Sequence, residues 1–378
     1  MLTLCLMIDI IKRFNIFMED TMISKYTHFI DLNDFDLEWW DKLLLLANKI
    51  IKNPKYYMHR CSGKVMGTLF YEPSTRTQMS FQTAMLKLGG SIIGFDNPST
   101  SSVSKGENLK DTTKVVSNYA DILVMRHPLE GSVKAAASTS DCPVINAGDG
   151  GHLHPTQTLT DLLTLKQEKG TLENLTIGLC GDLLNGRTTH SLCKAISCFK
   201  NNKFILISTP SLKIPCYIKE YIVAHGCTYE ERENLEDSIA ELDVLYMTRI
   251  QKERFDSEKE YLEQKNVYIL DNEKLKKAKS TLAILHPLPR VDEISIEVDE
   301  DERALYFKQA KYGVYARMAL ILTLLECEES GCVLFKGEKN QHTCPNPKCI
   351  TNQEKYLKKS YIRNSEMNIC EYCDKRFV

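Results

Sequence analysis

The segment Leu69-Phe70-Tyr71-Glu72-Pro73-Ser74-Thr75-Arg76-Thr77 joins the apolar end of a strand, a turn and the start of a helix. Pro73 confines its neighbours to extended geometry, which favours a break between the strand and the helix. The first helical turn then carries several hydroxyl side chains and one cation, Arg76. A strand that leads into a helix in this way is the building unit of parallel α/β sheets.

The same alternation continues from about residue 62 to residue 325, where short β-branched runs separate helical stretches. It predicts an α/β fold of two similar-sized parallel-sheet domains, with ligands at the strand carboxyl ends. A break at 170–175 marks the seam, and helices near 156–169 and 312–326 cross between the halves. We expect strands at 65–71, 91–95, 122–125, 144–146, 176–180, 204–208, 244–247 and 282–285, and helices at 37–51, 75–88, 109–119, 156–168, 187–199, 217–224 and 312–325.

Changes in character along the chain predict five segments. Residues 1–21 start apolar but lack a basic leader and a small-residue cleavage site, which argues against a signal peptide. We interpret them as a disordered N-terminal extension or as the product of an upstream start codon. Residues 22–169 and 170–327 form the two domains. A polar break then introduces a linker at 328–343 and a small domain, here called the tail, at 344–378.

The bulk charge of the 378 residues is close to neutral, at -2. It gives no general attraction to nucleic acid or to an anionic membrane, so local Arg and Lys clusters must hold any anionic ligand. No apolar run approaches the ~18 residues that a membrane span needs. We therefore expect a cytoplasmic protein that binds no nucleic acid and no membrane.

The turn Ser74-Thr75-Arg76-Thr77 is a candidate phosphate site. Free N–H groups and partial positive charge at a helix N-terminus attract phosphate, and the guanidinium of Arg76 fits two phosphate oxygens. The alternative for this segment alone is an ordinary helix cap followed by a surface arginine. The segment by itself does not decide between the two.

Other polar side chains are expected near the same sheet edge. Arg126 follows one predicted strand, and a Gly-rich turn after the next strand leads to His154 and Gln157. A separate polar loop carries Ser101 and Lys105. A lone histidine is more often structural and a loop lysine is usually solvated. Their convergence with the turn before the helix favours an anion site.

Three motifs together resemble the aspartate and ornithine carbamoyltransferase family: Ser74-Thr75-Arg76-Thr77, Arg126-His127-Pro128 and His154-Pro155-Thr156-Gln157. The resemblance covers about residues 25–327. It implies that 22–169 binds carbamoyl phosphate and that 170–327 binds the amino acid, with the last helix packing back on the first domain. It also implies a homo-oligomer, either a catalytic trimer or pairs of trimers, and no catalytic cofactor.

The motifs for the second substrate resemble the aspartate branch: Tyr246-Met247-Thr248-Arg249-Ile250-Gln251-Lys252-Glu253-Arg254 and His286-Pro287-Leu288-Pro289-Arg290. Ornithine enzymes place a Cys beside Leu-Pro and carry a Ser-Met-Gly element, and we find neither here. The resemblance implies transfer of the carbamoyl group from carbamoyl phosphate to the amine of L-aspartate. The products would be N-carbamoyl-L-aspartate and phosphate, in pyrimidine biosynthesis. A carbamoyltransferase for another amine, such as ornithine, is the alternative.

The resemblance also implies roles for individual residues. Implied as catalytic are Thr75, Arg76, Lys105, Arg126 and His154; implied in substrate binding are Ser74, Thr77, Ser101, Gln157, Arg187, Arg249, Gln251, Leu288 and Pro289. Of these, Arg187, Arg249 and Gln251 would bind aspartate, and Leu288 would offer its backbone carbonyl. Ser101 and Lys105 would reach the site of a neighbouring subunit.

A competing motif, Gly181-Asp182-Leu183-Leu184-Asn185-Gly186-Arg187-Thr188, follows a predicted strand and nearly spells a nucleotide-binding P-loop. Arg187 replaces the essential lysine of that loop. No strand further along ends in an obvious magnesium-binding aspartate. We therefore set the NTPase interpretation aside.

The tail contains the pairs Cys344 and Cys349, then Cys370 and Cys373, separated by twenty residues. Four thiolates in two close pairs suit tetrahedral Zn²⁺ and leave no open position for catalysis. Disulfides are not expected without a secretion signal. We predict one structural Zn²⁺ per chain. A nucleic-acid-binding zinc ribbon and a protein-contact module are both compatible with this pattern.

The tail is similar to the zinc domain of the regulatory chain of bacterial aspartate carbamoyltransferase, through Cys344-Pro345-Asn346 and Cys370-Glu371-Tyr372-Cys373. The stretch before it is too short for the nucleotide-binding domain of that chain, which argues against control by ATP or CTP through this chain. We expect the tail to pack on the carbamoyl-phosphate domain of its own or a neighbouring chain. A non-catalytic relative that uses the tail for binding is a third interpretation of the whole chain.

Overall fold

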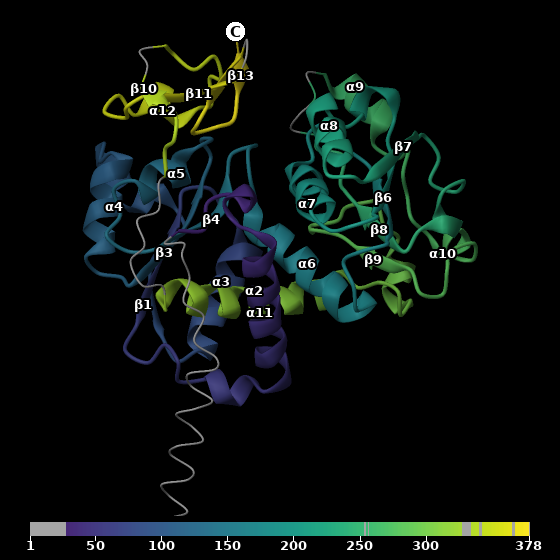
Figure 1. Ribbon diagram of the computed structural model, residues 1–378, viewed down its shortest axis with the longest axis horizontal. Helices are drawn as coiled ribbons and strands as arrows, with labels where there is room; N and C mark the ends of the chain where they lie inside the picture. The colour runs from purple at the N-terminus through teal and green to yellow at the C-terminus, as the bar shows by residue number, and fades with distance from the viewer. Residues whose placement is uncertain are drawn as a thin grey trace, which may run out of the picture.

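The computed structural model of the chain describes residues 28–252, 255, 257–326, 334–339, 342–364 and 367–377. They form two parallel sheets packed with helices and one small antiparallel sheet (Figure 1). The predicted extension at 1–21 and half of the predicted linker at 328–343 lie outside the described residues. In the described part, no helix is long and apolar enough to cross a membrane.

The first sheet has the strand order β2-β1-β3-β4, and all its neighbours are parallel. After β1 the chain adds β2 on one side, and after β3 it adds β4 on the other side. The direction in which strands are added therefore reverses between β1 and β3. Open α/β sheets bind ligands at the carboxyl ends of the strands beside such a reversal. The elements are β1 (Val65–Phe70), β2 (Ser91–Phe95), β3 (Ile122–His127), β4 (Val144–Asp149), α2 (Leu37–Lys52), α3 (Thr75–Lys87), α4 (Leu109–Ser117), α5 (Ser132–Ala137) and α6 (Pro155–Lys169).

The second sheet is also fully parallel, in the order β7-β6-β5-β8-β9. Its order reverses between β5 and β8. Each sheet therefore has one such reversal. The elements are β5 (Thr176–Cys180), β6 (Lys203–Ile207), β7 (Thr228–Arg232), β8 (Val244–Met247), β9 (Ala283–Leu285), α7 (Arg187–Ser197), α8 (Cys216–Ala224), α9 (Glu258–Gln264) and α10 (Asn272–Leu275).

Helix α11 (Tyr306–Leu325) leaves the second half and packs against α2, α3 and α6 of the first (Figure 1). Its apolar side chains share one core with residues of both sheets. The helix begins six residues before the predicted start at 312. The polar residues of its first turns hide the helical periodicity. One of them, Gln309, is buried because it donates a hydrogen bond to the buried Asp161.

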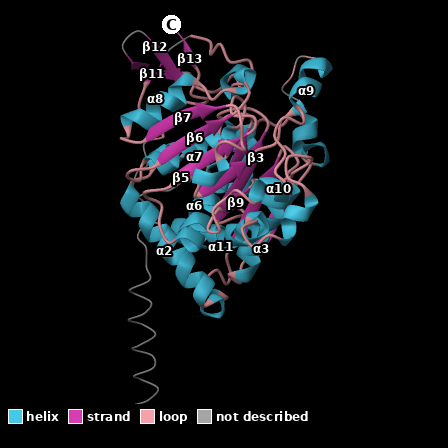
Figure 2. Ribbon diagram, turned by 90° about the vertical axis from the view of Figure 1, so that its right-hand side faces the viewer, coloured by secondary structure: helices cyan, strands magenta, loops and turns pink. Residues whose placement is uncertain are grey.

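The tail forms the antiparallel sheet β10-β11-β12-β13, which begins before residue 344. It packs on the first half of the same chain: the backbone N–H of Glu130 donates to Lys348, and that of Ile350 donates to Glu130, both at 2.9 Å. It also approaches α8, where the Arg376 guanidinium lies 5.8 Å from the Tyr217 ring (Figure 2). The elements are β10 (Glu338–Lys339), α12 (Ile350–Gln353), β11 (Ser360–Asn364), β12 (Met367–Cys370) and β13 (Arg376–Phe377).

Candidate active site

A cleft of about 570 Å³ lies between the two parallel sheets and takes its lining from both halves. Segments that follow β1 and β3 line one side, and segments that follow β5 and β8 line the other. These are the four strands at the two reversals of strand order. Both sheets therefore direct their ligand-binding ends into the same space.

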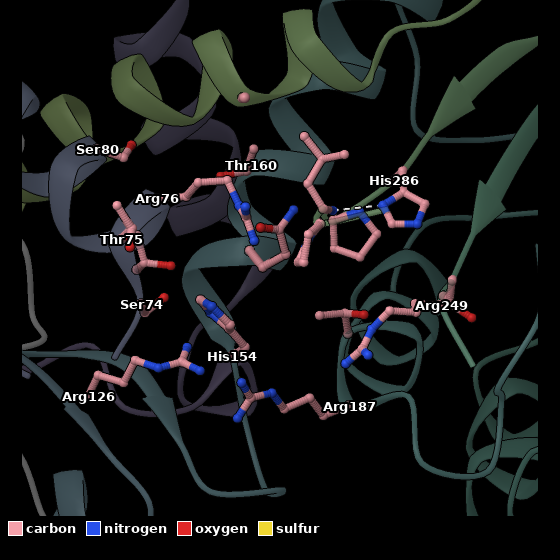
Figure 3. A pocket seen from close by; sticks show the side chains of 18 of the residues that line it. Ser74, Thr75, Arg76, Ser80, Arg126, His154, Thr160, Arg187, Arg249 and His286 are labelled. Carbon is pink, nitrogen blue, oxygen red and sulfur yellow. Dashed lines mark hydrogen bonds between the residues drawn. The ribbon is translucent and has the colours of Figure 1, made fainter. Parts of the chain in front are cut away.

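The N-terminus of α3 lines the first side of the cleft, with Ser74 as the cap residue. The Ser74 side chain makes no capping hydrogen bond, so its hydroxyl is available to a ligand. Thr75 and Arg76 are exposed and Thr77 is buried. Figure 3 shows Ser74, Thr75 and Arg76 grouped on the α3 side of the cavity.

Arg126 is the penultimate residue of β3 and is only 9% exposed. Its guanidinium lies 3.0 Å from the Glu72 carboxylate, which balances the charge and fixes the side chain. Gly148 lies against it with φ at +121°, and a Cβ there would come within 2.9 Å of the Arg126 Nη1 atom. A glycine is therefore needed for the guanidinium to occupy this position.

His154 precedes α6 and is buried in the middle of the site. Burial, together with the nearby cations Arg187, Arg126 and Arg317, lowers the pKa of His154 well below its ordinary value. The imidazole is therefore neutral at physiological pH and can donate one hydrogen bond without carrying a charge. Figure 3 shows Arg126 and Arg187 approaching it from opposite sides.

The second half contributes two arginines, which lie in the segments that follow the two strands of the reversal. Arg187 begins α7 and donates from Nη1 to the backbone carbonyl of Gly150 in the other half. Arg249 follows β8 and points into the same cavity (Figure 3). Gln251 donates from Nε2 to the Asn185 carbonyl at 3.3 Å, which joins its loop to the segment before α7.

The loop after β9 brings Leu288 and Pro289 to the cleft. Leu288 has φ at +52°, in the left-handed region that a leucine rarely adopts. His286 holds this turn, because its Nδ1 accepts from the Leu288 N–H at 2.7 Å while its Nε2 lies 2.8 Å from Glu293. His286 is thus engaged through both ring nitrogens.

Sequence reasoning missed a buried polar network beneath the cleft. Asp161 accepts hydrogen bonds from Gln157 at 2.8 Å, Gln309 at 2.6 Å and Tyr246 at 3.1 Å. Burial raises the pKa of Asp161 to about 7 in spite of these bonds. Arg317 was missed too, although a single Arg in the apolar run of α11 was a usable signal. The network connects α6, α11 and β8.

Twelve of the fourteen predicted catalytic and substrate-binding residues line the cleft: Ser74, Thr75, Arg76, Thr77, Arg126, His154, Gln157, Arg187, Arg249, Gln251, Leu288 and Pro289. Ser101 and Lys105 are not among its lining residues. They lie instead in a short 3-10 turn after β2, where Lys105 is exposed. The cleft of one chain is therefore assembled without them.

The four tail cysteines come together as a second candidate site. Their sulfur atoms all lie within 4.8 Å of one another and are buried, with Cys344 and Cys373 3.6 Å apart and Cys349 and Cys370 3.8 Å apart. These separations are far longer than the ~2.05 Å of a disulfide. They match the roughly 3.8 Å expected between thiolates around a tetrahedral Zn²⁺ with ~2.3 Å bonds. The geometry fits a metal with four cysteine ligands.

Fold and cleft together define a two-domain α/β transferase for anionic substrates. Residues 27–167 match the family described as "Aspartate/ornithine carbamoyltransferase, carbamoyl-P binding domain", and residues 173–324 match its "Asp/Orn binding domain". The chain therefore belongs to the aspartate/ornithine carbamoyltransferase family. Residues 339–378 match "Aspartate carbamoyltransferase regulatory chain, metal binding domain".

Known relatives agree with this assignment. The aspartate carbamoyltransferase catalytic subunit of Clostridium perfringens is 60% identical over 302 residues, which cover 80% of this chain and 98% of that protein. The catalytic subunit of M. jannaschii aspartate transcarbamoylase superposes with a TM-score of 0.75 at 44% identity, over 80% of this chain and 98% of that one. The Trypanosoma cruzi enzyme in complex with N-(phosphonacetyl)-L-aspartic acid gives 0.76 at 35% identity, over 81% and 99%.

Proposed function

We propose that the chain transfers the carbamoyl group of carbamoyl phosphate to the amine of L-aspartate. Support comes from the relatives, which are aspartate carbamoyltransferases. The observation that carries the proposal is the placement of two cations, Arg187 and Arg249, across the cleft from the α3 N-terminus. Aspartate has two carboxylates to neutralise, whereas the side-chain ammonium of ornithine would need an acceptor. The ornithine alternative is not favoured.

At the first side of the cleft, the N-terminus of α3 would hold the phosphate of carbamoyl phosphate. The N–H groups of its first turn and the hydroxyls of Ser74, Thr75 and Thr77 offer several donors to one anion. Arg76 adds a full charge and a planar fork that matches two phosphate oxygens. These contacts also stabilise the phosphate as it leaves with the electron pair of the broken C–O bond.

Arg126, His154 and Thr75 would donate to the carbonyl oxygen of the carbamoyl group. Attack by the aspartate amine turns this oxygen into an oxyanion, which preorganised donors stabilise more in the transition state than in the ground state. Gln157 gives its amide N–H to Asp161, which leaves its side-chain oxygen to accept from the carbamoyl amine. The backbone carbonyl of Leu288 is a second acceptor for amine protons.

At the second side, Arg187 and Arg249 would each pair with one carboxylate of aspartate, and Gln251 would support the same substrate. The amine then forms a C–N bond with the carbamoyl carbon, the C–O bond to phosphate breaks, and the amine proton leaves with the phosphate. No protein nucleophile is needed, because phosphate is a good leaving group. Holding both substrates in line supplies much of the rate enhancement.

The active form is proposed to be a catalytic trimer, or a pair of trimers, because the cleft of one chain lacks Ser101 and Lys105. Both follow the edge strand β2, whose side chains are largely exposed. A neighbouring chain seated on this edge would receive Lys105 in its own cleft. Mixing inactive Lys105→Ala and Arg126→Ala chains tests this, because hybrid trimers regain intact sites only if the residues come from different chains. An absence of regained activity would refute the shared site.

The metal of the tail is proposed to be one structural Zn²⁺ per chain, held by the four cysteine thiolates. Bound there, Zn²⁺ would supply folding energy to a module with a small core, and it would take no part in the transfer. We also propose that the protein acts in the cytoplasm, where such thiols stay reduced.

The direct test is product formation from carbamoyl phosphate with L-aspartate and, in parallel, with L-ornithine. We expect N-carbamoyl-L-aspartate and one phosphate per turnover with the first amine and neither product with the second. The matched control is Arg249→Leu, which removes one aspartate contact from the far side of the cleft. Release of phosphate with carbamoyl phosphate and ornithine, but not with carbamoyl phosphate and aspartate, would refute the proposed substrate. An inactive chain with both amines would favour a binding protein.

A further inference from the structure

The loop between β4 and α6 connects the tail to the cleft. It runs from Asp149 to His154, so its last residue is the buried histidine of the site. Its second residue, Gly150, accepts the hydrogen bond from Arg187. The position of this one loop therefore sets where two groups of the cleft stand.

His152, two residues before His154, is not among the residues that line the cleft and instead contacts the tail. Its Nδ1 lies 3.1 Å from the Asp149 carboxylate, and its Nε2 lies 3.1 Å from the carboxylate of Asp374. Asp374 directly follows the last of the four cysteines. The histidine thus bridges the loop and the cysteine cluster.

Asp149 links His152 to other parts of the loop and to its neighbours through hydrogen bonds. Its carboxylate accepts from the backbone N–H groups of Gly131 at 2.8 Å and Leu153 at 3.2 Å, and from the Asn146 amide at 3.1 Å. Gly131 in turn lies under Tyr372 of the tail, where a Cβ would come within 2.6 Å. The loop is therefore held from the tail at two neighbouring points.

The backbone of Asp374 is suited to this role. Its φ is +57°, and its N–H donates to the carbonyl of Cys370 at 2.9 Å, inside the turn that carries two of the cysteines. Aspartate is one of the few residues apart from glycine that enter this left-handed region readily. The metal-binding turn thus fixes the direction of the carboxylate.

We propose that Asp374 is a positioning residue for the active site, which acts through His152 to hold the loop that carries Gly150 and His154. The inference rests on the proposed carbamoyl transfer. The tail would then be part of the catalytic unit, because it sets the geometry of the cleft from a distance. Misplacement of reacting groups by about 1 Å costs on the order of a hundredfold in rate.

The test uses Asp374→Gly and His152→Asn in the full-length, metal-loaded protein. Glycine removes the carboxylate and keeps the left-handed backbone, and asparagine is too short to reach both carboxylates. We expect each variant to lower kcat by roughly tenfold or more and to raise the KM for aspartate. The KM for carbamoyl phosphate should rise less than that for aspartate, because the groups of α3 that would hold the phosphate are not part of the loop. Together the substitutions should do no more than either alone.

Lys134→Met is the matched control, because Lys134 also ties the tail to the first half, donating to the Glu371 carbonyl at 2.7 Å from α5. We expect it to lower the melting temperature without changing kcat or KM. Bound metal is measured for every variant. If Asp374→Gly loses metal, the kinetics of His152→Asn alone test the inference, because His152 lies outside the tail.

Wild-type kinetics in His152→Asn, equal kinetic effects of Lys134→Met, or additive effects in the double variant would each overturn the inference. A wild-type protein that forms no N-carbamoyl-L-aspartate would instead overturn the proposed function. The two failures are therefore distinguishable.

Discussion

Replacing Asp161 by asparagine should change how the stability of the protein depends on pH. The buried carboxyl has its pKa raised to about 7, against an ordinary value of 3.8. The folded state therefore keeps a proton on Asp161 between these values, while the unfolded chain has lost it. A raised folded pKa means that the stabilising contribution is complete below the ordinary pKa and is lost as the pH rises through 7.

The size of the effect follows from the shift. One pKa unit corresponds to about 1.4 kcal/mol. Stability falls between the ordinary pKa of 3.8 and the folded pKa of about 7, and about two units of this range lie between pH 5 and pH 8. The wild type should lose roughly 2–3 kcal/mol of stability from this group over that interval. Asp161→Asn has no such proton, so its stability relative to the wild type should rise by the same amount.

Urea unfolding at pH 5 and pH 8 measures the difference, with the fluorescence of Trp39 and Trp40 in the core as the signal. Asp121→Asn is the matched control. Although part burial opposes it, hydrogen bonds from Lys64 and Val65 lower the pKa of Asp121, so its substitution should add no change between pH 5 and pH 8. A stability difference between wild type and Asp161→Asn that is the same at both pH values would refute the reasoning.

Three further substitutions test the cleft and the tail. Arg126→Ala should lower kcat by about 10²–10³-fold, as loss of one oxyanion donor does; steady-state kinetics at saturating substrates measure this, and a near-normal kcat would remove Arg126 from the chemistry. Arg249→Lys keeps the charge but loses the planar fork, so the KM for aspartate should rise about tenfold or more with an unchanged KM for carbamoyl phosphate; equal changes in both would contradict a role on aspartate alone. Cys349→Ser should abolish stoichiometric metal binding and lower the melting temperature of the protein, because the tail would lose its metal. Metal analysis and calorimetry measure the two effects, and full metal content would argue against four-cysteine ligation.

Much of the fold was predictable because strong local signals agreed with the tertiary structure. The strands β2, β5 and β8 have the predicted bounds. The apolar residues of β5 and β8 fill mostly buried, central positions, whereas β2 is an exposed edge strand whose Ile92 and Ile93 still give a β-branched signal. The edge strand β7 was missed. Its sequence, Thr-Tyr-Glu-Glu-Arg, is mostly charged because it borders solvent, and only pairing with β6 makes it a strand.

The residues of the candidate site differ in the same way in how far the sequence predicts them. Most of the predicted residues that line the cleft follow strand ends or helix starts, so local motifs such as Ser74-Thr75-Arg76-Thr77 pointed to them. Supporting residues such as Asp161, Gln309 and Tyr246 are far apart in sequence and meet only through packing. Nothing local distinguishes them from ordinary helix and strand residues. The contact between His152 and Asp374 belongs to this second class.

The tail belongs to the same polypeptide as the cleft beside which it packs, and this changes the mass action of its binding. A module on a separate chain leaves its partner when the protein is diluted. A module tethered by a short connection stays at an effective concentration in the millimolar range whatever the total concentration. Each catalytic domain therefore carries its own metal module in a fixed one-to-one ratio. Dilution can separate neighbouring chains, but it cannot remove the tail from the loop that it contacts.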